Sequence, residues 1–349
     1  MSTAAGGTSL LRAPTQRRRR RPDVRARHPS MAPRRRHPAM RSPEELRRNT
    51  VRRQLRGVAS SDFRPDVEGM RALAVIVVVL FHLRIGVFKG GFVGVDVFFV
   101  LSGFLITRLL LNELAASGTI ALPNFWARRA RRLLPASVLV IVATLVAGRW
   151  MLSPIDQRAL AGDATAAGGF VVNFVFAHRS SDYFDSQTAH SPLLHFWSLA
   201  VEEQFYLLWP LVIVLLARRP RQYRRLLLTV IIVAATASVA ASVWLTRHYD
   251  KVAFYLLPAR IGELLAGAAV ATAGAAFAVV DARYRAGLAW FGLLGIAVAV
   301  LTFEADAGFP GSQAMLPVLG TVLVLVAGGA GAASIGPARF LGHPGGLWI

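Results

Sequence analysis

The sequence predicts an all-α fold, a polytopic transmembrane helical bundle of about nine spans. Of the 349 residues, 54% are hydrophobic, and the mean hydropathy is +0.47, which is more apolar than an ordinary soluble domain. The chain also contains several apolar runs of about 17–25 residues, which is the length that an α-helix needs to cross the hydrocarbon core of a bilayer.

Nine candidate spans follow one another along the chain, each bounded by polar, basic or glycine-rich residues. They are 70–86, 92–111, 133–150, 164–177, 195–217, 226–246, 254–274, 287–303 and 316–333. The fourth is short and glycine-rich, so it is either a span or a re-entrant, partly embedded segment. We expect the fifth helix to begin near Pro192, with Ser191 as its N-cap and His195 in its first turn.

The first 60 residues differ in composition from the rest. Residues 1–56 contain 17 arginines and three acidic residues, so they supply +14 of the total charge of +21. No long apolar stretch marks them as a signal peptide. We expect residues 1–60 to be a disordered, basic, cytoplasmic tail that can lie against anionic membrane lipids, and residues 61–349 to be the membrane domain. No aromatic residue is interleaved with the arginine runs, so nucleic-acid binding is not expected.

The distribution of arginine predicts the orientation, because cytoplasmic loops carry an excess of basic residues. The basic tail places the N-terminus in the cytoplasm. The four arginines between Arg128 and Arg132 place the loop after the second span there too. The loop after the fifth span, Arg218 to Arg225, is equally basic, yet strict alternation of spans places it outside. A re-entrant fourth segment would remove this conflict.

The stretch from Phe63 to Thr107 combines two apolar runs with three ionisable residues, Arg71, His82 and Asp96. A charge at the bilayer centre costs about 2.5–3.5 kcal/mol on insertion scales, so these residues need a reason to be there. Arg71 and His82 are 11 positions apart, which places them on one face of a helix, three turns and about 16 Å apart. They can line one route through the membrane without touching.

Three stretches resemble acyltransferase family 3, a family of integral-membrane enzymes that transfer acyl groups to hydroxyls, usually of cell-envelope carbohydrates. The stretches are Arg71-x10-His82 followed by GGFVGVDVFFVLSGFLIT, FWARRARRLLPA from Phe125 to Ala136, and SPLLHFWSLAVEEQFYLLWP from Ser191 to Pro210. The resemblance runs from about Phe63 to at least Pro258. The sequence after Phe340–Gly342 departs from the family pattern, so we expect the chain to stop before the family's tenth helix.

The resemblance implies that His82 is the general base. Histidine titrates near neutrality, so it can take the proton of an attacking hydroxyl and return it to a leaving thiolate. Asp96 either orients His82, pairs with an arginine, or is an interfacial carboxylate at a helix N-terminus. Arg71 either positions a substrate or extends its guanidinium to the headgroups.

Arg129 and Arg132 match the Arg-x-x-Arg pattern of the family. The donor in this family is acyl-coenzyme A, so these arginines can bind its phosphates. The alternative is a basic segment that only obeys the positive-inside rule.

Two carboxylates, Glu202 and Glu203, lie well inside an apolar helix, where they either serve the reaction or pair with an arginine of another helix. His195 lies seven residues before Glu202 and shares its face of the helix. Arg260 and Glu263 are expected near helix ends.

We therefore predict a membrane O-acyltransferase that moves an acyl group, acetyl first, from acyl-coenzyme A to a hydroxyl of an envelope glycan or lipid-linked sugar. His82, Arg71, Asp96 and Glu202 are the candidate catalytic residues. The chain has no cysteine and no zinc-binding histidine spacing, so we expect no metal and no permanently bound cofactor. The alternative is a transporter or non-catalytic membrane protein on the same helices, because intramembrane Arg, His and Glu also suit proton-coupled transport.

Overall fold

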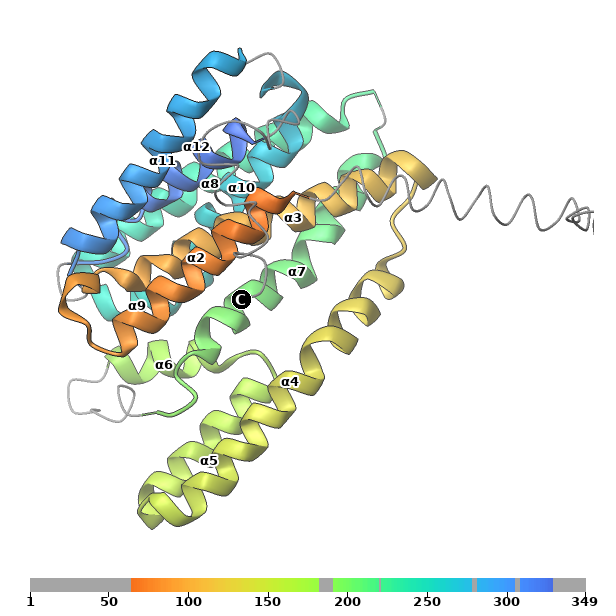
Figure 1. Cartoon of the computed structure of the whole chain (residues 1–349). Helices are drawn as coiled ribbons and strands as arrows, with labels where there is room; N and C mark the ends of the chain where they lie inside the picture. Colours follow the sequence, from red (N-terminus) through yellow and green to blue (C-terminus); the bar gives the residue numbers. More distant parts are fainter. Residues whose placement is uncertain (1–63, 182–190, 220, 278–280, 305–307, 329–349) are drawn as a thin grey trace, which may run out of the picture. The chain divides into compact units, whose positions relative to one another are not determined.

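The computed structural model describes residues 64–181, 191–219, 221–277, 281–304 and 308–328, and every element within these ranges is a helix (Figure 1). The elements are α2 (Pro65–His82), η1 (Gly86–Phe88), η2 (Gly91–Val93), α3 (Gly94–Ser117), α4 (Leu122–Met151), α5 (Pro154–Gly168), α6 (Val172–Ser181), α7 (Phe196–Ala217), α8 (Tyr223–His248), α9 (Asp250–Tyr255), α10 (Leu257–Phe277), α11 (Ala282–Thr302) and α12 (Met315–Ala327). The predicted all-α class is confirmed. The basic tail and the sequence after residue 328, including the predicted loss of the tenth helix, lie outside the described residues.

Five described helices are long and apolar enough to cross a membrane. They lie at Gly91–Ser117, Leu122–Met151, Phe196–Ala217, Tyr223–His248 and Tyr284–Thr302, and α12 is a shorter apolar helix. Together with α2 and α10, which lie at two further predicted spans, they form the bundle of a multi-pass membrane protein.

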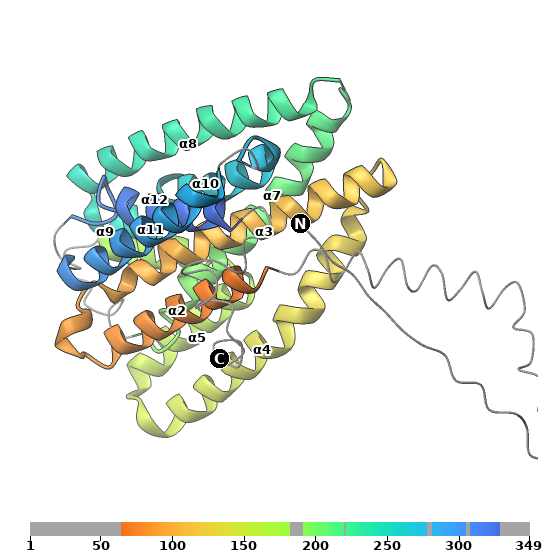
Figure 2. The same cartoon turned by 45° about the horizontal axis from the view of Figure 1, so that its top comes forward.

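Helix α3 is the most buried of these spans and packs against α2, α7, α10 and α12. It lies between α2 and α10 (Figure 2). Glycines allow its close approach to α10: a Cβ atom on Gly103 would lie 1.8 Å from the Leu264 carbonyl oxygen, and one on Gly267 would lie 1.8 Å from that of Val100. Small residues at such crossings let membrane helices pack backbone to backbone. The α3–α10 pair is therefore the fixed centre on which the site is built.

Helix α4 begins earlier than predicted. Pro123 lies in its first turn, where a missing N–H costs nothing, and the helix starts at Leu122 rather than near residue 133. The four arginines between Arg128 and Arg132 therefore belong to the helix and not to a loop.

The predicted fourth span, 164–177, is wrong as a single helix. The segment breaks between α5 and α6, after Gly168 and Gly169, and Phe170 adopts a φ of 54°. The tip of this helical hairpin lies beside the middle of α7, because the Gln204 side chain donates hydrogen bonds to the Phe170 carbonyl (3.0 Å) and to Asn173 Oδ1 (2.8 Å). The ion pair between buried Asp163 and partly buried Arg179 (2.7 Å) joins its two arms. The chain approaches the tip along α5 and leaves it along α6, so both arms lie on the same side of the tip, as the re-entrant alternative requires.

Two sets of contacts define two ends of the bundle. At one end, where α2 finishes and α7 starts, the His82 and His195 rings lie 4.5 Å apart; we call it the histidine end. At the other, Arg64 before α2 donates a hydrogen bond to the Leu325 carbonyl near the end of α12 (3.1 Å). Helix α7 also finishes at this second end, which we call the arginine end. The Arg218–Arg225 segment thus lies at the same end as the start of α2, so the conflict in orientation disappears.

Candidate active site

His82 is the last residue of α2, and its ring is exposed at the histidine end. Its Nδ1 atom lies 2.7 Å from the carbonyl oxygen of Val78, one turn earlier. A carbonyl oxygen only accepts hydrogen bonds, so Nδ1 carries the hydrogen and the Nε2 lone pair is left to accept a proton. The helix end thus fixes the tautomer that a general base at Nε2 needs.

His195 lies at the N-cap position of α7, immediately before the membrane span. Its ring stands nearly perpendicular to the His82 ring, at 89°. Burial of the ring, and then the neighbouring His82, hold the pKa of His195 below its ordinary value, so the neutral form is favoured. The expected start of this helix near Pro192 is wrong. Residues 192–195 form a turn, and the Ser191 hydroxyl donates a hydrogen bond to Asp163 (2.7 Å).

Arg71 lies three turns before His82 on α2 and does not join the histidine pair. Its guanidinium lies 3.3 Å from the carboxylate of Glu68, and both side chains are partly exposed. The 11-residue separation along the helix corresponds to about 16 Å. The structure therefore separates these two predicted site residues, as the helical geometry requires.

Asp96 pairs with Arg260, which is the second of the alternatives for this residue. The Arg260 Nη1 atom lies 3.1 Å from Asp96 Oδ1 and 2.7 Å from Glu263 Oε1. Arg260 and Asp96 are fully buried, and Glu263 nearly so. Arg260 lies in the first turn of α10 and Glu263 one turn further along, which agrees with the expected position near a helix end, and both side chains are buried. Asp96 was the sequence feature that could have indicated this buried ion pair, because a carboxylate in an apolar span needs an oppositely charged partner.

Four aromatic rings surround the Arg260 guanidinium at 5.4–5.6 Å from their centroids; they belong to Phe99, Trp197, Phe254 and Phe309. Cation–π contacts of this kind stabilise a desolvated guanidinium. Trp197 follows His195 by two positions, so the Arg260 cluster supports the first turn of α7 and with it the histidine pair.

Glu202 accepts hydrogen bonds from two hydroxyls, those of Ser102 on α3 and Tyr206 one turn further along α7. The bond from Ser102 ties the middle of α7 to α3. Glu202 is seven positions after His195, about 10 Å further into the bundle on the same face. The Ser102 contact depends on how α3 and α7 pack, whereas Tyr206 lies four residues after Glu202 on the same helix, a spacing that could have identified it from the sequence.

Glu203 pairs with Arg129 across α7 and α4, at 3.5 Å. The Arg129 guanidinium also lies 4.0 Å from the centroid of the Tyr206 ring. Arg129 is thus turned inward, whereas Arg132 is exposed. The two arginines expected to bind phosphates together point into different surroundings in this structure.

A cavity of about 380 Å³ lies between α4, α7 and the tip of the α5–α6 hairpin. Its walls are mostly apolar, and its lining includes Trp126, Arg129, Phe170, Glu203, Gln204 and Tyr206. Arg129 Nε and Gln204 Oε1 are buried and have no hydrogen-bond partner. The cavity is mostly apolar, with the side chains of Arg129, Glu203 and Gln204 among its few polar lining residues. No group of three or more His, Asp or Glu among the described residues is arranged to hold a metal ion.

These features define a multi-pass membrane protein with a histidine pair at one end of its bundle and an arginine-lined cavity beside its middle. Residues 64–343 match the profile of a family described as an acyltransferase domain, which is about four fifths of the chain. The chain therefore belongs to this family, and the predicted resemblance is confirmed.

Curated relatives carry related names. Over 151 residues the chain is 47% identical to the peptidoglycan O-acetyltransferase OatA of Listeria monocytogenes, covering 43% of this chain and 24% of that protein. It is 44% identical over 153 residues to the putative peptidoglycan O-acetyltransferase YrhL of Bacillus subtilis, covering 43% and 24%. It is 43% identical over 164 residues to an O-acetyltransferase OatA of Staphylococcus aureus, covering 47% and 27%. The matched stretch thus spans about a quarter of each relative. No solved structure matches the chain.

Proposed function

We propose that this chain is a membrane O-acyltransferase that moves an acyl group, acetyl first, from acyl-coenzyme A to a hydroxyl of a cell-envelope glycan. The family supports the reaction class, and the names of the relatives support acetyl and peptidoglycan. The structural observation that carries the proposal is His82, whose Nδ1 is held by the Val78 carbonyl so that Nε2 is the basic nitrogen.

In the proposed reaction, Nε2 of His82 takes the proton of the acceptor hydroxyl as its oxygen attacks the thioester carbonyl. The new C–O bond forms, the C–S bond breaks, and His82 returns the proton to the departing thiolate. His195, whose neutral form is favoured, packs edge to face against the His82 ring and orients it. No group besides donor and acceptor is needed to balance the step.

The arginine end is proposed to face the cytoplasm, because it collects the Arg218–Arg225 segment and the start of α2 with its preceding basic tail. The N-terminus is then cytoplasmic and the histidine end faces the opposite side. Acyl-coenzyme A, which is made in the cytoplasm, enters from the arginine end, and the glycan or lipid-linked sugar reaches His82 from the other side.

The cavity beside the hairpin tip is the proposed site for the arm of the donor. Coenzyme A carries two amides between its phosphates and its sulfur, and Gln204 and Arg129 of the cavity lining are the polar side chains proposed to bind them. Gln204 lies nine residues after His195, about 13 Å along α7. The arm would therefore occupy the cavity while the thioester extends towards the histidine end. Exposed Arg132 remains the proposed phosphate contact.

The other predicted site residues have supporting roles in this proposal. Arg71 lies too far from His82 to act on it and is assigned to positioning the donor with Glu68. Asp96 supports α7 through Arg260. Glu202 fixes Ser102 and Tyr206 beside the donor's route, and Glu203 holds Arg129 at the cavity.

The test is thioester consumption by membranes that contain the chain, supplied with labelled acetyl-coenzyme A and a soluble glycan acceptor, with and without an ionophore. Acetyl transfer to the acceptor that continues when ion gradients are collapsed supports the proposal. If the chain consumes no thioester and instead moves a solute only while a gradient exists, the transporter alternative replaces it.

A further inference from the structure

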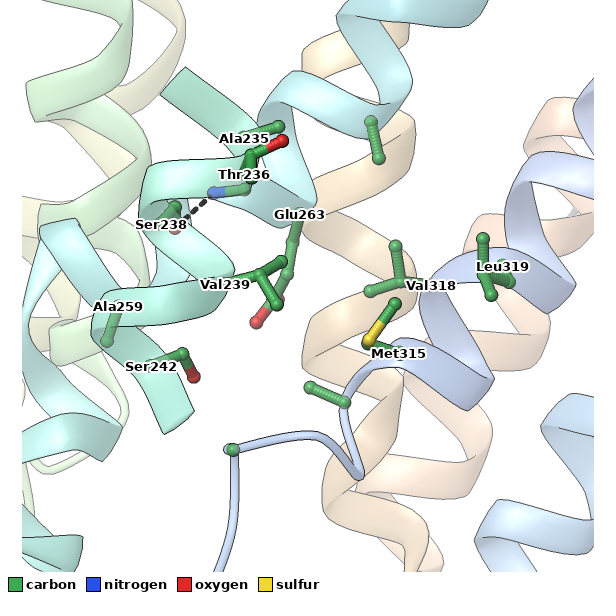
Figure 3. Close-up of a pocket in the computed structure, with 14 residues that line it drawn as sticks. Ala235, Thr236, Ser238, Val239, Ser242, Ala259, Glu263, Met315, Val318 and Leu319 are labelled. Atoms are coloured by element: carbon green, nitrogen blue, oxygen red, sulfur yellow. Dashed lines mark hydrogen bonds between the residues drawn. The ribbon is translucent and has the colours of Figure 1, made fainter. Parts of the chain in front are cut away.

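Glu263 and Asp163 are buried carboxylates with different surroundings. Glu263 lies at the wall of an apolar cavity of about 370 Å³ between α8, α10 and the start of α12 (Figure 3). Its charge is met by Arg260 within the buried cluster, so it needs no ligand from the cavity. The partners of Asp163 instead come from two other parts of the chain, and one of them leads directly to the histidine end.

Asp163 lies in the middle of α5 and is 1% exposed. Its Oδ1 atom lies 2.7 Å from Arg179 Nη1 on α6, and its Oδ2 atom accepts a hydrogen bond from the Ser191 hydroxyl at 2.7 Å. A buried carboxylate is tolerated only when it is paired and hydrogen-bonded. These three residues, which we call the Asp163 clasp, therefore join α5, α6 and the turn that precedes α7.

The Ser191 hydroxyl carries this contact into the backbone of the turn. It also accepts a hydrogen bond from the backbone N–H of Leu193 at 3.3 Å, so one hydroxyl bridges the carboxylate and the turn. The Leu193 side chain is buried and packs with Leu160 and Ala164 of α5, which lie on the same face of that helix as Asp163. The turn is thus held on α5 by one polar and one apolar contact.

His195 ends this turn, four residues after Ser191. Within the part of the chain that the structure describes, its side chain makes no capping hydrogen bond to α7. The position of its ring therefore follows from the backbone of the turn. Because the ring packs against that of His82 at 4.5 Å, a tilt of the turn would separate the two rings.

We propose that Asp163 is a positioning residue for acyl transfer, because through Ser191 it holds the turn that presents His195 to His82. The inference rests on the proposed function. Asp163 touches neither the proposed donor cavity nor the His82 ring, so it acts only through the turn. Arg179 balances its charge and keeps the carboxylate in place.

The same hairpin also reaches the donor cavity. Gly169 and Phe170 at its tip line that cavity, and Gly169 follows Asp163 by six residues, about 9 Å of helix. One element thus contacts both the donor cavity and the turn before His195. Loss of the clasp should displace the histidine pair relative to the bound donor.

The test compares variants of two Ser–Asp hydrogen bonds that α5 makes. Ser191→Ala removes the hydroxyl but leaves the Asp163–Arg179 pair, so it tests the proposal even if Asp163→Ala fails to fold. Ser191→Thr keeps a hydroxyl and is the conservative variant. Ser153→Ala is the control, because it removes the bond to Asp156 (2.6 Å) at the exposed start of the same helix.

Two quantities are measured on the full chain in nanodiscs. The first is the pKa of His195, from NMR of isotope-labelled histidine with the signal assigned by its loss in His195→Gln. The second is the rate of acetyl transfer from acetyl-coenzyme A. Burial and the neighbouring His82 lower the pKa of His195, so this pKa reports whether the ring keeps its place.

We expect Ser191→Ala to raise the pKa of His195 towards its ordinary value and to lower the rate by about 10–10²-fold, as a small misplacement of reacting groups does. Asp163→Ala should have the same two effects, and combining the two substitutions should add little, because they break one contact. Ser191→Thr and Ser153→Ala should match the wild-type chain in both measurements.

An unchanged pKa of His195 in both Ser191→Ala and Asp163→Ala would overturn the proposal, even if the rate falls, because the loss would then come from general destabilisation. If the pKa rises as expected while the wild-type chain transfers no acetyl, the proposed function fails and the hold of Asp163 on His195 stands. A raised pKa with an undiminished rate would show that this hold is not needed for acyl transfer.

Discussion

The His82 and His195 rings meet edge to face, 4.5 Å apart, although more than a hundred residues separate them in the sequence. One ring ends α2 and the other begins α7. This contact joins the two helices at the histidine end and places a proton acceptor with a defined tautomer beside a second, neutral imidazole.

The lowered pKa of His195 predicts a pH-dependent stability. Because the folded chain holds this pKa below the value of the unfolded chain, the unfolded state binds the proton first as the pH falls. The contribution of the neutral ring is therefore intact above the unfolded value, near 6.5, and declines as the pH falls from there through the folded value. Denaturant titrations between pH 7.5 and 5 should show a steeper loss of stability for the wild-type chain than for His195→Gln. Parallel curves for the two proteins would contradict this assignment.

We expect the chain to lose much of its stability when the single cation of the buried Asp96–Arg260–Glu263 cluster is removed. Arg260→Met leaves two buried carboxylates without a partner and should destabilise the chain by about 3–5 kcal/mol. The matched control is Arg128→Met, which breaks the more exposed pair with Glu113 and should cost at most about 1 kcal/mol. Unfolding in a denaturing detergent series measures both. Similar losses in the two variants would show that the buried cluster is not structurally important.

Variants of the Arg129–Glu203 pair can distinguish an effect on stability from an effect on donor binding. Arg129→Ala leaves Glu203 unpaired and should lower both stability and donor affinity, whereas the double variant Arg129→Ala/Glu203→Ala restores the charge balance and should recover stability. If Arg129 binds the donor, KM for acyl-coenzyme A stays raised in the double variant by about ten-fold. Full recovery of KM in the double variant would confine Arg129 to a structural role.

The re-entrant α5–α6 hairpin predicts which ends of the bundle share a side of the membrane. The chain contains no cysteine, so single cysteines can be introduced directly. With a membrane-impermeant maleimide, Lys89→Cys at the histidine end should be labelled in intact cells, and Arg218→Cys only after permeabilisation. Labelling of both in intact cells would show that the α5–α6 segment crosses the membrane once and that the hairpin assignment fails.

The sequence predicted the features that depend on local pattern. Apolar run length predicted α2, α3, α4, α7, α8, α10, α11 and α12, but not α5, α6 and α9 as separate helices. The 11-residue spacing correctly separated Arg71 from His82. The break at Gly168–Gly169 was open to two interpretations, because glycine permits a break without requiring one. The distinction depended on Gln204, whose hydrogen bond to Phe170 places the hairpin tip beside α7.

Most contacts between helices could not be predicted from the sequence. Asp96 was correctly given an arginine as one possible partner, but which arginine depends on the close α3–α10 crossing at Gly103 and Gly267. Ser102 of α3 became a partner of Glu202 through the packing of α3 against α7. His195 was identified as a candidate, but its contact with His82 needed the three-dimensional arrangement of α2 and α7.

The claim that His82 is the general base is tested most directly by comparing two histidines with the same local geometry. His248, like His82, lies at the end of its helix, is exposed, and has Nδ1 bound to the carbonyl one turn earlier. The measurement is the rate of acetyl transfer from acetyl-coenzyme A by membranes containing wild-type chain, His82→Gln or His248→Gln at equal expression. If His82 is the general base, His82→Gln lowers the rate by about 10²–10⁴-fold and His248→Gln leaves it unchanged. An active wild-type chain whose rate is the same in His82→Gln would contradict the account.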